Sequence, residues 1–259
     1  FDHVILYVHG GAFMTGSRND SIVVAYCRVM SERGFRVATI DYRLGMESFT
    51  LKGMKFVKAI QSAIYMAVED CSAAVVYLIE KEGVDADKVI LAGSSAGAIT
   101  VLQTDYMHSN GSWHTALLPD TLRFAGIIAY SGAVLTTEGL IDYARSPAPT
   151  MLFHGTKDNI VTYNEIRLFK YGFFGTNSLV KRLKKYNCPY YVRRYKGLSH
   201  EVCHYGSKTA LETEYFVQRY IIIVASTSIY DYRVHNITTT VYERSRTRWL
   251  YWARLKCHH

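Results

Sequence analysis

The stretch at residues 88–100 constrains this chain most, because an apolar run there leads into Gly93-Ser94-Ser95-Ala96-Gly97 and then into a helix-forming segment. The pattern predicts a strand, a tight turn and a helix, with Ser95 at the tip of the turn. Such a turn leaves little room for side chains, which explains the glycines two positions either side of Ser95. Its hydroxyl would project beside a helix N-terminus, which favours developing negative charge. Alone, the motif fits a simple packing turn equally well.

Short apolar segments alternate with amphipathic segments along the 259 residues, and this alternation predicts the fold class. The apolar runs are typical of strands buried on both faces. Strands are expected in the run before Ser95 and at 4–8, 35–40, 124–130, 150–154 and 190–195. Helices are expected at 21–33, 57–81, 97–107, 138–145, 177–186 and 211–223, with a surface loop at 45–55. The pattern indicates an α/β domain with a mostly parallel sheet and helices on both faces.

The residues that follow the expected strands carry most of the functional information. In parallel sheets the carboxyl ends of the strands lie at one edge, where ligands bind. In chain order these ends carry His9-Gly10-Gly11, Asp41-Tyr42-Arg43, Ser95, Ser131-Gly132, Asp158 and His200. The edge therefore combines a serine, an acid and a histidine, in that order, with a glycine pair. This combination is far more specific than the Ser95 turn by itself.

Ser95, His200 and Asp158 have the chemical properties of a catalytic triad. A serine hydroxyl needs a base during attack, and His200 is the candidate base. Asp158 would fix the tautomer of His200 and stabilise its imidazolium form. Asp158 is also a natural turn residue, which is compatible with this role, and a plain surface-loop residue is the alternative for His200. Among the other histidines, His204 is the rival base, whereas His154 falls inside a strand end.

The glycines after the first strand have a clear role in the same chemistry. Acyl transfer places negative charge on an oxygen, which needs amide donors that are already in position. The amides of Gly10 and Gly11 can join the amide of Ala96, the residue after the candidate nucleophile. A flexible turn would explain one glycine but not the whole set. We expect His9 to brace this loop.

Candidates for a substrate pocket are apolar residues near these strand ends. They are Phe13, Met14, Trp113 and Val161, followed by Ile160, Phe173 and Phe174. Taken individually, each one is better explained as a packing residue of the core or the surface, and only a minority of the set is expected to line a pocket. Asp41 and Arg43 are expected to form a structural ion pair.

Composition and charge exclude several other classes of function. The chain has a formal net charge of +8, but residues 226–259 hold six basic and two acidic residues, so this tail alone supplies half of it. The remaining balance does not favour nucleic-acid binding, and the basic cluster at 181–185 has the spacing of a solvated helix face. Five scattered cysteines without a Cys-x-x-Cys pair predict no metal site and leave one disulfide open. No apolar run predicts a membrane span.

Taken together, these motifs resemble the α/β-hydrolase superfamily, and more narrowly its carboxylesterase and hormone-sensitive-lipase-like branch of bacterial esterases. The resemblance covers about 4–223 and rests on residues 7–13, 41–44, 93–97, 153–158 and 197–201. It implies a serine esterase that works through an acyl-enzyme without a cofactor or metal. Some relatives release acetyl or feruloyl groups from xylan, so short acyl or carbohydrate-linked esters are the expected substrates. A peptidase of the same fold and a non-catalytic binding protein are the alternatives.

Two departures from this branch affect the expected domain organisation. Its members usually carry two strands before the first one expected here, so the sheet would lack them and the chain, which begins at Phe1, is expected to be N-terminally truncated or trimmed. The Arg-, Thr-, Tyr- and Trp-rich tail matches nothing in the branch. We therefore expect a hydrolase domain at 1–225 and an atypical basic tail at 226–259. Oligomeric state and localisation stay open.

Overall fold

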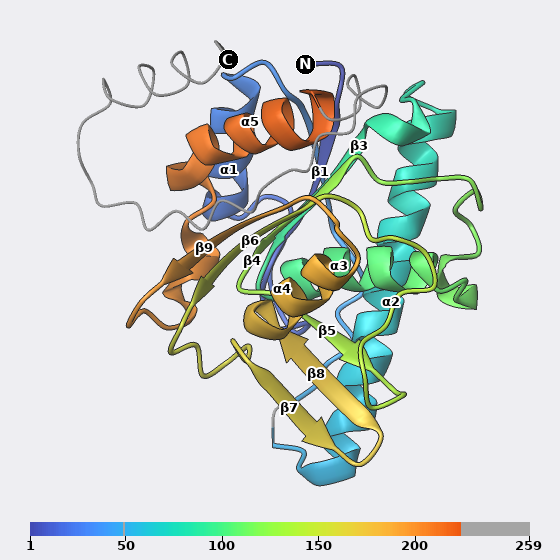
Figure 1. Ribbon diagram of the computed structural model, residues 1–259, viewed down its shortest axis with the longest axis vertical. Helices are drawn as coiled ribbons and strands as arrows, with labels where there is room; N and C mark the ends of the chain where they lie inside the picture. Colours follow the sequence, from blue (N-terminus) through green and yellow to red (C-terminus); the bar gives the residue numbers. More distant parts are fainter. Residues whose placement is uncertain (49, 224–259) are drawn as a thin grey trace.

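The computed structural model describes residues 1–48 and 50–223, which form a parallel sheet covered by helices (Figure 1). The sheet has six strands in the order β2-β1-β3-β4-β6-β9, and every pairing is parallel. The strands are β1 (Val4–Val8), β2 (Arg36–Ile40), β3 (Val89–Ser94), β4 (Gly126–Tyr130), β6 (Thr150–Gly155) and β9 (Tyr190–Tyr195). All six carboxyl ends therefore lie along one edge of the sheet. This confirms the predicted α/β class and its strands.

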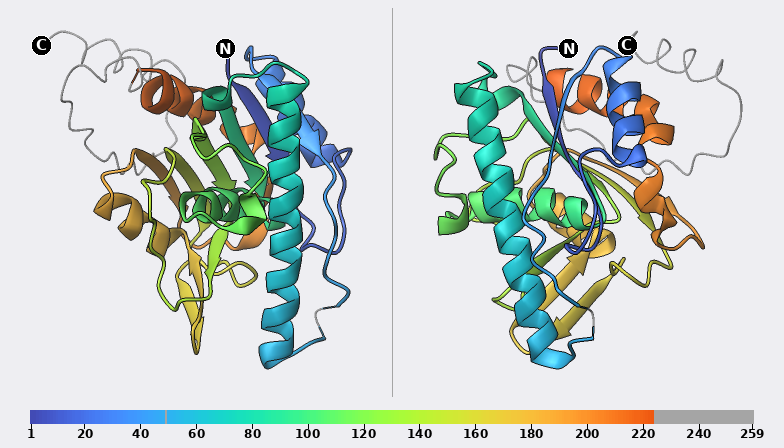
Figure 2. Two further views of the ribbon diagram at one scale, coloured as in Figure 1. Left: turned by 90° about the vertical axis from the view of Figure 1, so that its right-hand side faces the viewer. Right: turned by 180° about the vertical axis from the view of Figure 1, so that it is seen from behind.

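Alternation along the buried strands separates two apolar cores, one on each face of the sheet. On β1, Ile5 and Tyr7 face one core, whereas Val4, Leu6 and Val8 face the other. The first core is completed by α1 (Ser21–Ser31) and α5 (Ala210–Phe216), and the second by α2 (Gly53–Glu80), α3 (Ala96–Ser109) and α4 (Thr176–Lys185). In Figures 1 and 2, α1 and α5 lie together on the face opposite α2. Both faces are thus covered by helices, as predicted.

The ends of several helices differ from the prediction. Helix α2 begins at Gly53, inside the segment expected to be a loop. The last predicted helix is α5 followed by a π-helix at Val217–Ile222. Short 3-10 helices occupy Ala86–Lys88, Trp113–Thr115, His200–His204 and Ser207–Thr209.

Helix α2 is long and apolar enough to cross a membrane, yet eight of its residues are buried inside the fold.

A second sheet was not predicted from the sequence. It has three antiparallel strands in the order β5-β8-β7, at Ala133–Thr136, Tyr171–Gly175 and Glu165–Leu168. In Figure 1 its β7–β8 hairpin projects from the edge where the parallel strands end. The hairpin lies between β6 and α4 in sequence and contributes Phe174 to the core.

The helix predicted at 138–145 is wrong. The segment is irregular, because its backbone amides bond to side chains rather than to one another. Tyr143 donates its N–H to the Tyr186 hydroxyl (3.0 Å), and Ala144 donates its N–H to Oδ1 of Asn110 (2.9 Å). Buried Ile141 and Tyr143 then anchor the segment in the core without helical periodicity.

The expected ion pair between Asp41 and Arg43 is also wrong. Arg43 reaches α2, where its Nε lies 2.9 Å from Oδ1 of Asp70 and its terminal nitrogen lies 2.8 Å from Oε2 of Glu69. Asp41 instead accepts the backbone N–H of Arg18 (2.7 Å). Asp70 and Glu69, which are adjacent on α2, offer the Arg43 guanidinium more acceptor oxygens than Asp41 does. The carboxylate of Asp41 is already bonded to the backbone of Arg18.

Two further expectations concern the ends of the sheet and of the chain. Within the described residues the sheet ends at β2 on one side, and this partly exposed strand pairs only with β1. The basic tail at 226–259 lies outside the described residues, and so does Cys257. The four described cysteines, at 27, 71, 188 and 203, are free thiols.

Candidate active site

Ser95 occupies the sharp turn between β3 and α3. Its backbone has φ of 52° and ψ of −118°, a left-handed conformation that L-residues adopt at a cost. The turn is fixed to the neighbouring strand, because the Ser95 N–H donates to the carbonyl of Tyr130 (2.9 Å). A Cβ at Gly93 would lie 2.5 Å from the carbonyl carbon of Gly97, so the turn closes only with glycine at these positions.

Gly97 gives the clearest stability prediction for this turn. A Cβ there would overlap the carbonyl oxygen of Val8 and lie 2.6 Å from that of His9, because α3 crosses directly over the end of β1. We expect Gly97→Ala to lower the free energy of unfolding by about 3 kcal/mol, as in other overpacked sites. Urea unfolding followed by circular dichroism measures this loss.

Gly111→Ala is the matched control at the other end of α3. Its φ is +67°, but a Cβ there would meet no atom within 4 Å. Only the backbone strain remains, which costs about 1 kcal/mol. Equal losses in the two variants would contradict a steric role for Gly97.

Three side chains from three separate loops form one hydrogen-bonded chain, called the triad below. Oγ of Ser95 lies 2.8 Å from Nε2 of His200, and Nδ1 of His200 lies 2.8 Å from Oδ2 of Asp158. His200 begins the 3-10 helix after β9, and Asp158 lies in the turn after β6. The rival His204 is exposed at the far end of that 3-10 helix, without a hydrogen bond to Ser95 or Asp158 among the described residues.

The carboxylate of Asp158 is buried and surrounded by donors. Its Oδ1 accepts the backbone N–H groups of Ile160 (3.0 Å) and Val161 (2.9 Å). Burial would raise the pKa of Asp158, but hydrogen bonds from His154, His200 and the Val161 amide outweigh it and hold this pKa well below its usual range. Asp158 therefore stays ionised.

The electrostatics of His200 follow from this partner. Its side chain is mostly buried, and burial alone would lower the pKa of the imidazole. The bond to ionised Asp158 outweighs burial, with a further contribution from the Cys203 thiol, and raises the pKa of His200 above its ordinary value of 6.5. The arrangement thus strengthens His200 as a proton acceptor for Ser95.

The loop after β1 lies directly against the Ser95 turn. A Cβ at Gly10 would lie 3.1 Å from the carbonyl oxygen of Ser94 and 3.3 Å from Cβ of Ser95. Gly11 has φ of 108°, which only glycine adopts easily, and its carbonyl accepts the N–H groups of Met14 and Thr15 (both 3.0 Å). Within the described residues, the amides of Gly10, Gly11 and Ala96 donate no backbone hydrogen bond. These three N–H groups therefore remain candidate donors to a ligand at the turn, as the sequence predicts.

His9 holds this loop in place. The side chain is buried, and Nδ1 donates to the Gly10 carbonyl (2.6 Å). Its ring stacks on Tyr42 with centroids 4.4 Å apart, and the Tyr42 hydroxyl donates back to the His9 carbonyl (3.1 Å). Tyr42, which precedes Arg43 at the end of β2, was not singled out from the sequence.

The first four of the seven pocket candidates lie in different environments. Phe13 is buried and packs edge-on against Tyr42, and Met14 is half-buried beside the same core. Val161 is also buried, and its backbone N–H donates to Oδ1 of Asp158 (2.9 Å). Trp113 is wrong as a candidate, because it follows the far end of the 14-residue α3, roughly 20 Å along the helix from Ser95, where it is 73% exposed.

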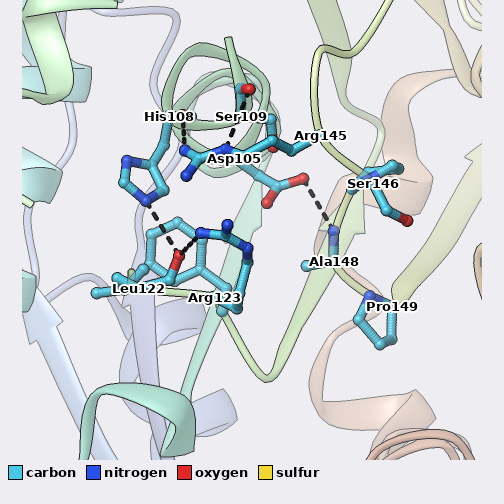
Figure 3. Close-up of a pocket in the computed structure, with 11 residues that line it drawn as sticks. Asp105, His108, Ser109, Leu122, Arg123, Arg145, Ser146, Ala148 and Pro149 are labelled. Atoms are coloured by element: carbon cyan, nitrogen blue, oxygen red, sulfur yellow. Dashed lines mark hydrogen bonds between the residues drawn. The ribbon is translucent and has the colours of Figure 1, made fainter. Parts of the chain in front are cut away.

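The cavity in Figure 3 lies at the same far end of α3 and measures about 190 Å³. Asp105 on α3 lines it and accepts the backbone N–H of Ala148 (3.3 Å), while burial raises the pKa of Asp105 to about 7. Arg145 donates to the carbonyl of Ser109 (3.3 Å), near the end of α3. These contacts tie the segment before β6 to α3, away from the triad. Among the described residues, no group of His, Cys, Asp or Glu is placed to hold a metal ion.

Comparison with known proteins places the chain in a family. The BD-FAE family model matches residues 2–132, which include the loop after β1 and the Ser95 turn. The chain belongs to the BD-FAE family. The matched region ends just after β4, so Asp158 and His200 of this BD-FAE member lie outside it.

One curated relative of this BD-FAE member is gut esterase 1 from Caenorhabditis elegans. The two are 27% identical over 150 residues, which is 56% of this chain and 26% of the relative. The chain thus spans about a quarter of the length of that protein.

Several solved esterases share the fold of this BD-FAE member. Propionate-bound Est2 from the Planctomycetes species Thermogutta terrifontis is 18% identical, with a TM-score of 0.57 over 83% of this chain and 82% of that one. Inhibited esterase B from Lactobacillus rhamnosis is 16% identical, with a TM-score of 0.57 over 88% and 79%. Esterase PE8 is 18% identical, with a TM-score of 0.57 over 83% and 92%. This BD-FAE member therefore has the α/β-hydrolase fold.

Proposed function

We propose that this protein is a serine carboxylic ester hydrolase that works through an acyl-enzyme. The observation that carries the proposal is the hydrogen bond of 2.8 Å between Oγ of Ser95 and Nε2 of His200, at a strained turn beside three available amides. Membership of the BD-FAE family and relatives that are named esterases support the same class of reaction.

In the first half-reaction, Oγ of Ser95 attacks the ester carbonyl carbon while its proton moves to Nε2 of His200. Asp158 remains ionised and stabilises the imidazolium that forms. The amides of Gly10, Gly11 and Ala96 donate to the oxyanion. The ester C–O bond then breaks, the leaving alcohol takes the proton from Nε2, and the acyl group stays on Ser95.

In the second half-reaction, water attacks the acyl-enzyme and gives a proton to His200. The tetrahedral intermediate collapses, the bond to Ser95 breaks, and Ser95 recovers the proton from Nε2. The products are a carboxylic acid and the free enzyme. The chain supplies each of these groups itself, so the proposed reaction uses no cofactor or metal.

Short acyl esters, including acetyl and feruloyl esters of carbohydrates, are the proposed substrate class. One structural relative, Est2 of Thermogutta terrifontis, was solved with propionate, a three-carbon acid. Phe13, two residues after Gly11, is buried and packs edge-on against Tyr42, so its side chain fills space beside the loop that supplies Gly10 and Gly11. The sequence resemblance to acetyl-xylan and feruloyl esterases points to the same group.

A substrate panel tests this proposal. We expect p-nitrophenyl acetate and butyrate to be hydrolysed much faster than p-nitrophenyl octanoate, with methyl ferulate and acetylated xylan as further substrates. Dipeptide p-nitroanilides should be poor substrates, because an amine leaving group needs stronger protonation than an alkoxide. Faster cleavage of the anilides would identify a peptidase. Failure of a fluorophosphonate to label Ser95 would identify a non-catalytic protein.

A further inference from the structure

His154 is a second histidine that contacts the acid of the triad. It lies on β6, four residues before Asp158, and its side chain is completely buried. Nε2 of His154 is 3.2 Å from Oδ2 of Asp158, the same oxygen that lies 2.8 Å from Nδ1 of His200. One carboxylate oxygen thus contacts two imidazoles.

The hydrogen-bond partners of His154 define its tautomer. Nε2 also lies 3.0 Å from the carbonyl oxygen of Val161, and a carbonyl and a carboxylate are both acceptors only. Nε2 must therefore carry hydrogen. Nδ1 lies 2.8 Å from the hydroxyl of Thr176, the buried first residue of α4, which can donate to it. A neutral His154 satisfies all three partners with Thr176 as the donor.

We propose that His154 is a positioning residue of the triad, whose Nε2–H holds Oδ2 of Asp158 toward His200 and withdraws part of the negative charge from that oxygen. This proposal rests on the proposed function. The N–H groups of Ile160 and Val161 hold Oδ1 of the carboxylate, and the side chain of His154 holds Oδ2. Because an oxygen shared between two donors is a weaker acceptor for each, His154 limits how strongly Asp158 stabilises the charged form of His200.

Three other side chains lie near His154 and Asp158 in space or in sequence. The ring of Tyr163 lies edge-on to His154, with centroids 5.6 Å apart, and its hydroxyl accepts from Nε of Arg194 on β9 (2.9 Å). The Cys203 thiol faces His200 from the 3-10 helix. Lys157, the residue before Asp158, is exposed. Of these side chains, only those of His154 and His200 contact the Asp158 carboxylate itself within the described residues.

Two amide variants separate this role from simple packing. The amide nitrogen of glutamine reaches about as far as Nε2 of histidine, whereas that of asparagine reaches only as far as Nδ1. His154→Asn keeps a polar group near Thr176 but loses the donor to Asp158, and His154→Gln restores that donor. In His154→Asn we expect the acid limb of the kcat/KM profile to move up by roughly half a pH unit or more. His154→Gln should keep the wild-type limb.

Two-dimensional NMR of the imidazole of His200 makes the test independent of turnover. We expect the titration midpoint of His200 to rise in His154→Asn and to match wild type in His154→Gln, whether or not esters are hydrolysed. An inactive wild-type protein would therefore overturn the proposed function without deciding the role of His154. An unchanged or lowered midpoint in His154→Asn, or equal midpoints in the two variants, would overturn the role of His154.

Thr176→Val carries the test if His154→Asn does not fold, as judged by circular dichroism. Valine keeps the volume of threonine but removes the hydroxyl that favours the Nε2–H tautomer. We expect the midpoint of His200 to shift in the same direction, by less than in a variant that lacks the donor completely. A midpoint equal to that of wild type would show that the tautomer of His154 has no influence on the triad.

Discussion

Ser95→Ala is expected to lower kcat/KM for p-nitrophenyl acetate by roughly 10⁴-fold or more, because the attacking oxygen is lost while the rest of the site stays. Alanine keeps the Cβ of serine and meets the same backbone requirement at φ of 52°. The Ser95 N–H would still donate to the Tyr130 carbonyl, so the turn should remain closed. Ester hydrolysis and urea unfolding of the same sample measure the two effects.

Ser131→Ala is the matched control for this experiment. Ser131 follows β4, the neighbouring strand, and is also a buried serine with a left-handed backbone, at φ of 56°. Its hydroxyl has no hydrogen-bond partner among the described residues. We expect Ser131→Ala to keep activity within a few-fold of wild type. Retained hydrolysis in Ser95→Ala would exclude Ser95 as the nucleophile.

Asp158→Asn should have the second largest effect and change the pH dependence as well. His200 must be neutral to accept the proton of Ser95, so kcat/KM should rise with pH through the pKa of His200 and be lost below it. Asp158 raises this pKa above 6.5, and removing its charge should bring the acid limb to lower pH. The value of kcat/KM on the high-pH plateau should fall roughly 10³-fold or more, because a neutral amide does not stabilise the imidazolium as the carboxylate does.

A pH series of kcat/KM for wild type and Asp158→Asn measures both changes. Asp142→Asn is the control, because Asp142 is an exposed aspartate that pairs with Lys185 on the surface. Its acid limb and plateau should match those of wild type. An acid limb that stays in place in Asp158→Asn would mean that a group other than His200 controls the rate.

The parallel sheet was predictable because its signals are local. Each central strand is a continuous apolar run, and such a run is stable as a strand only with both faces covered. The glycines around Ser95 and at Gly10 were equally informative, because close backbone approach leaves few other residue types possible. Once the strand ends were known, the shared edge brought Ser95, Asp158 and His200 together without further information.

The second sheet lacked such signals. All four residues of β7 are exposed, so they show no buried face, and β5 pairs with a strand more than 30 residues away. Its hairpin turns at Phe169, which is 84% exposed with φ of 53°, rather than at an Asn-Gly or Asp-Gly pair. The prediction that Trp113 lines the substrate pocket failed because the sequence alone does not show how far the C-terminal end of α3 lies from Ser95.

His154 and Tyr42 show a different limit of the sequence. Both are ordinary residues of a strand end, and their partners come from elements far away in the chain. A buried histidine beside an aspartate four residues later fits packing as well as function. The distances to Oδ2 of Asp158 and to Thr176 support the proposed positioning role of His154, which the His154→Asn and His154→Gln variants test.

The triad has a consequence for the protein during its own synthesis. The proposed nucleophile Ser95 and the proposed base His200 are 105 residues apart, and Asp158 precedes His200 by 42. At ribosomal rates of 5–20 residues per second, roughly 5–20 s pass between the appearance of Ser95 and that of His200. During this interval the nascent chain carries a serine without a base. Under the proposed function, Ser95 therefore gains its base only once β9 has joined the sheet.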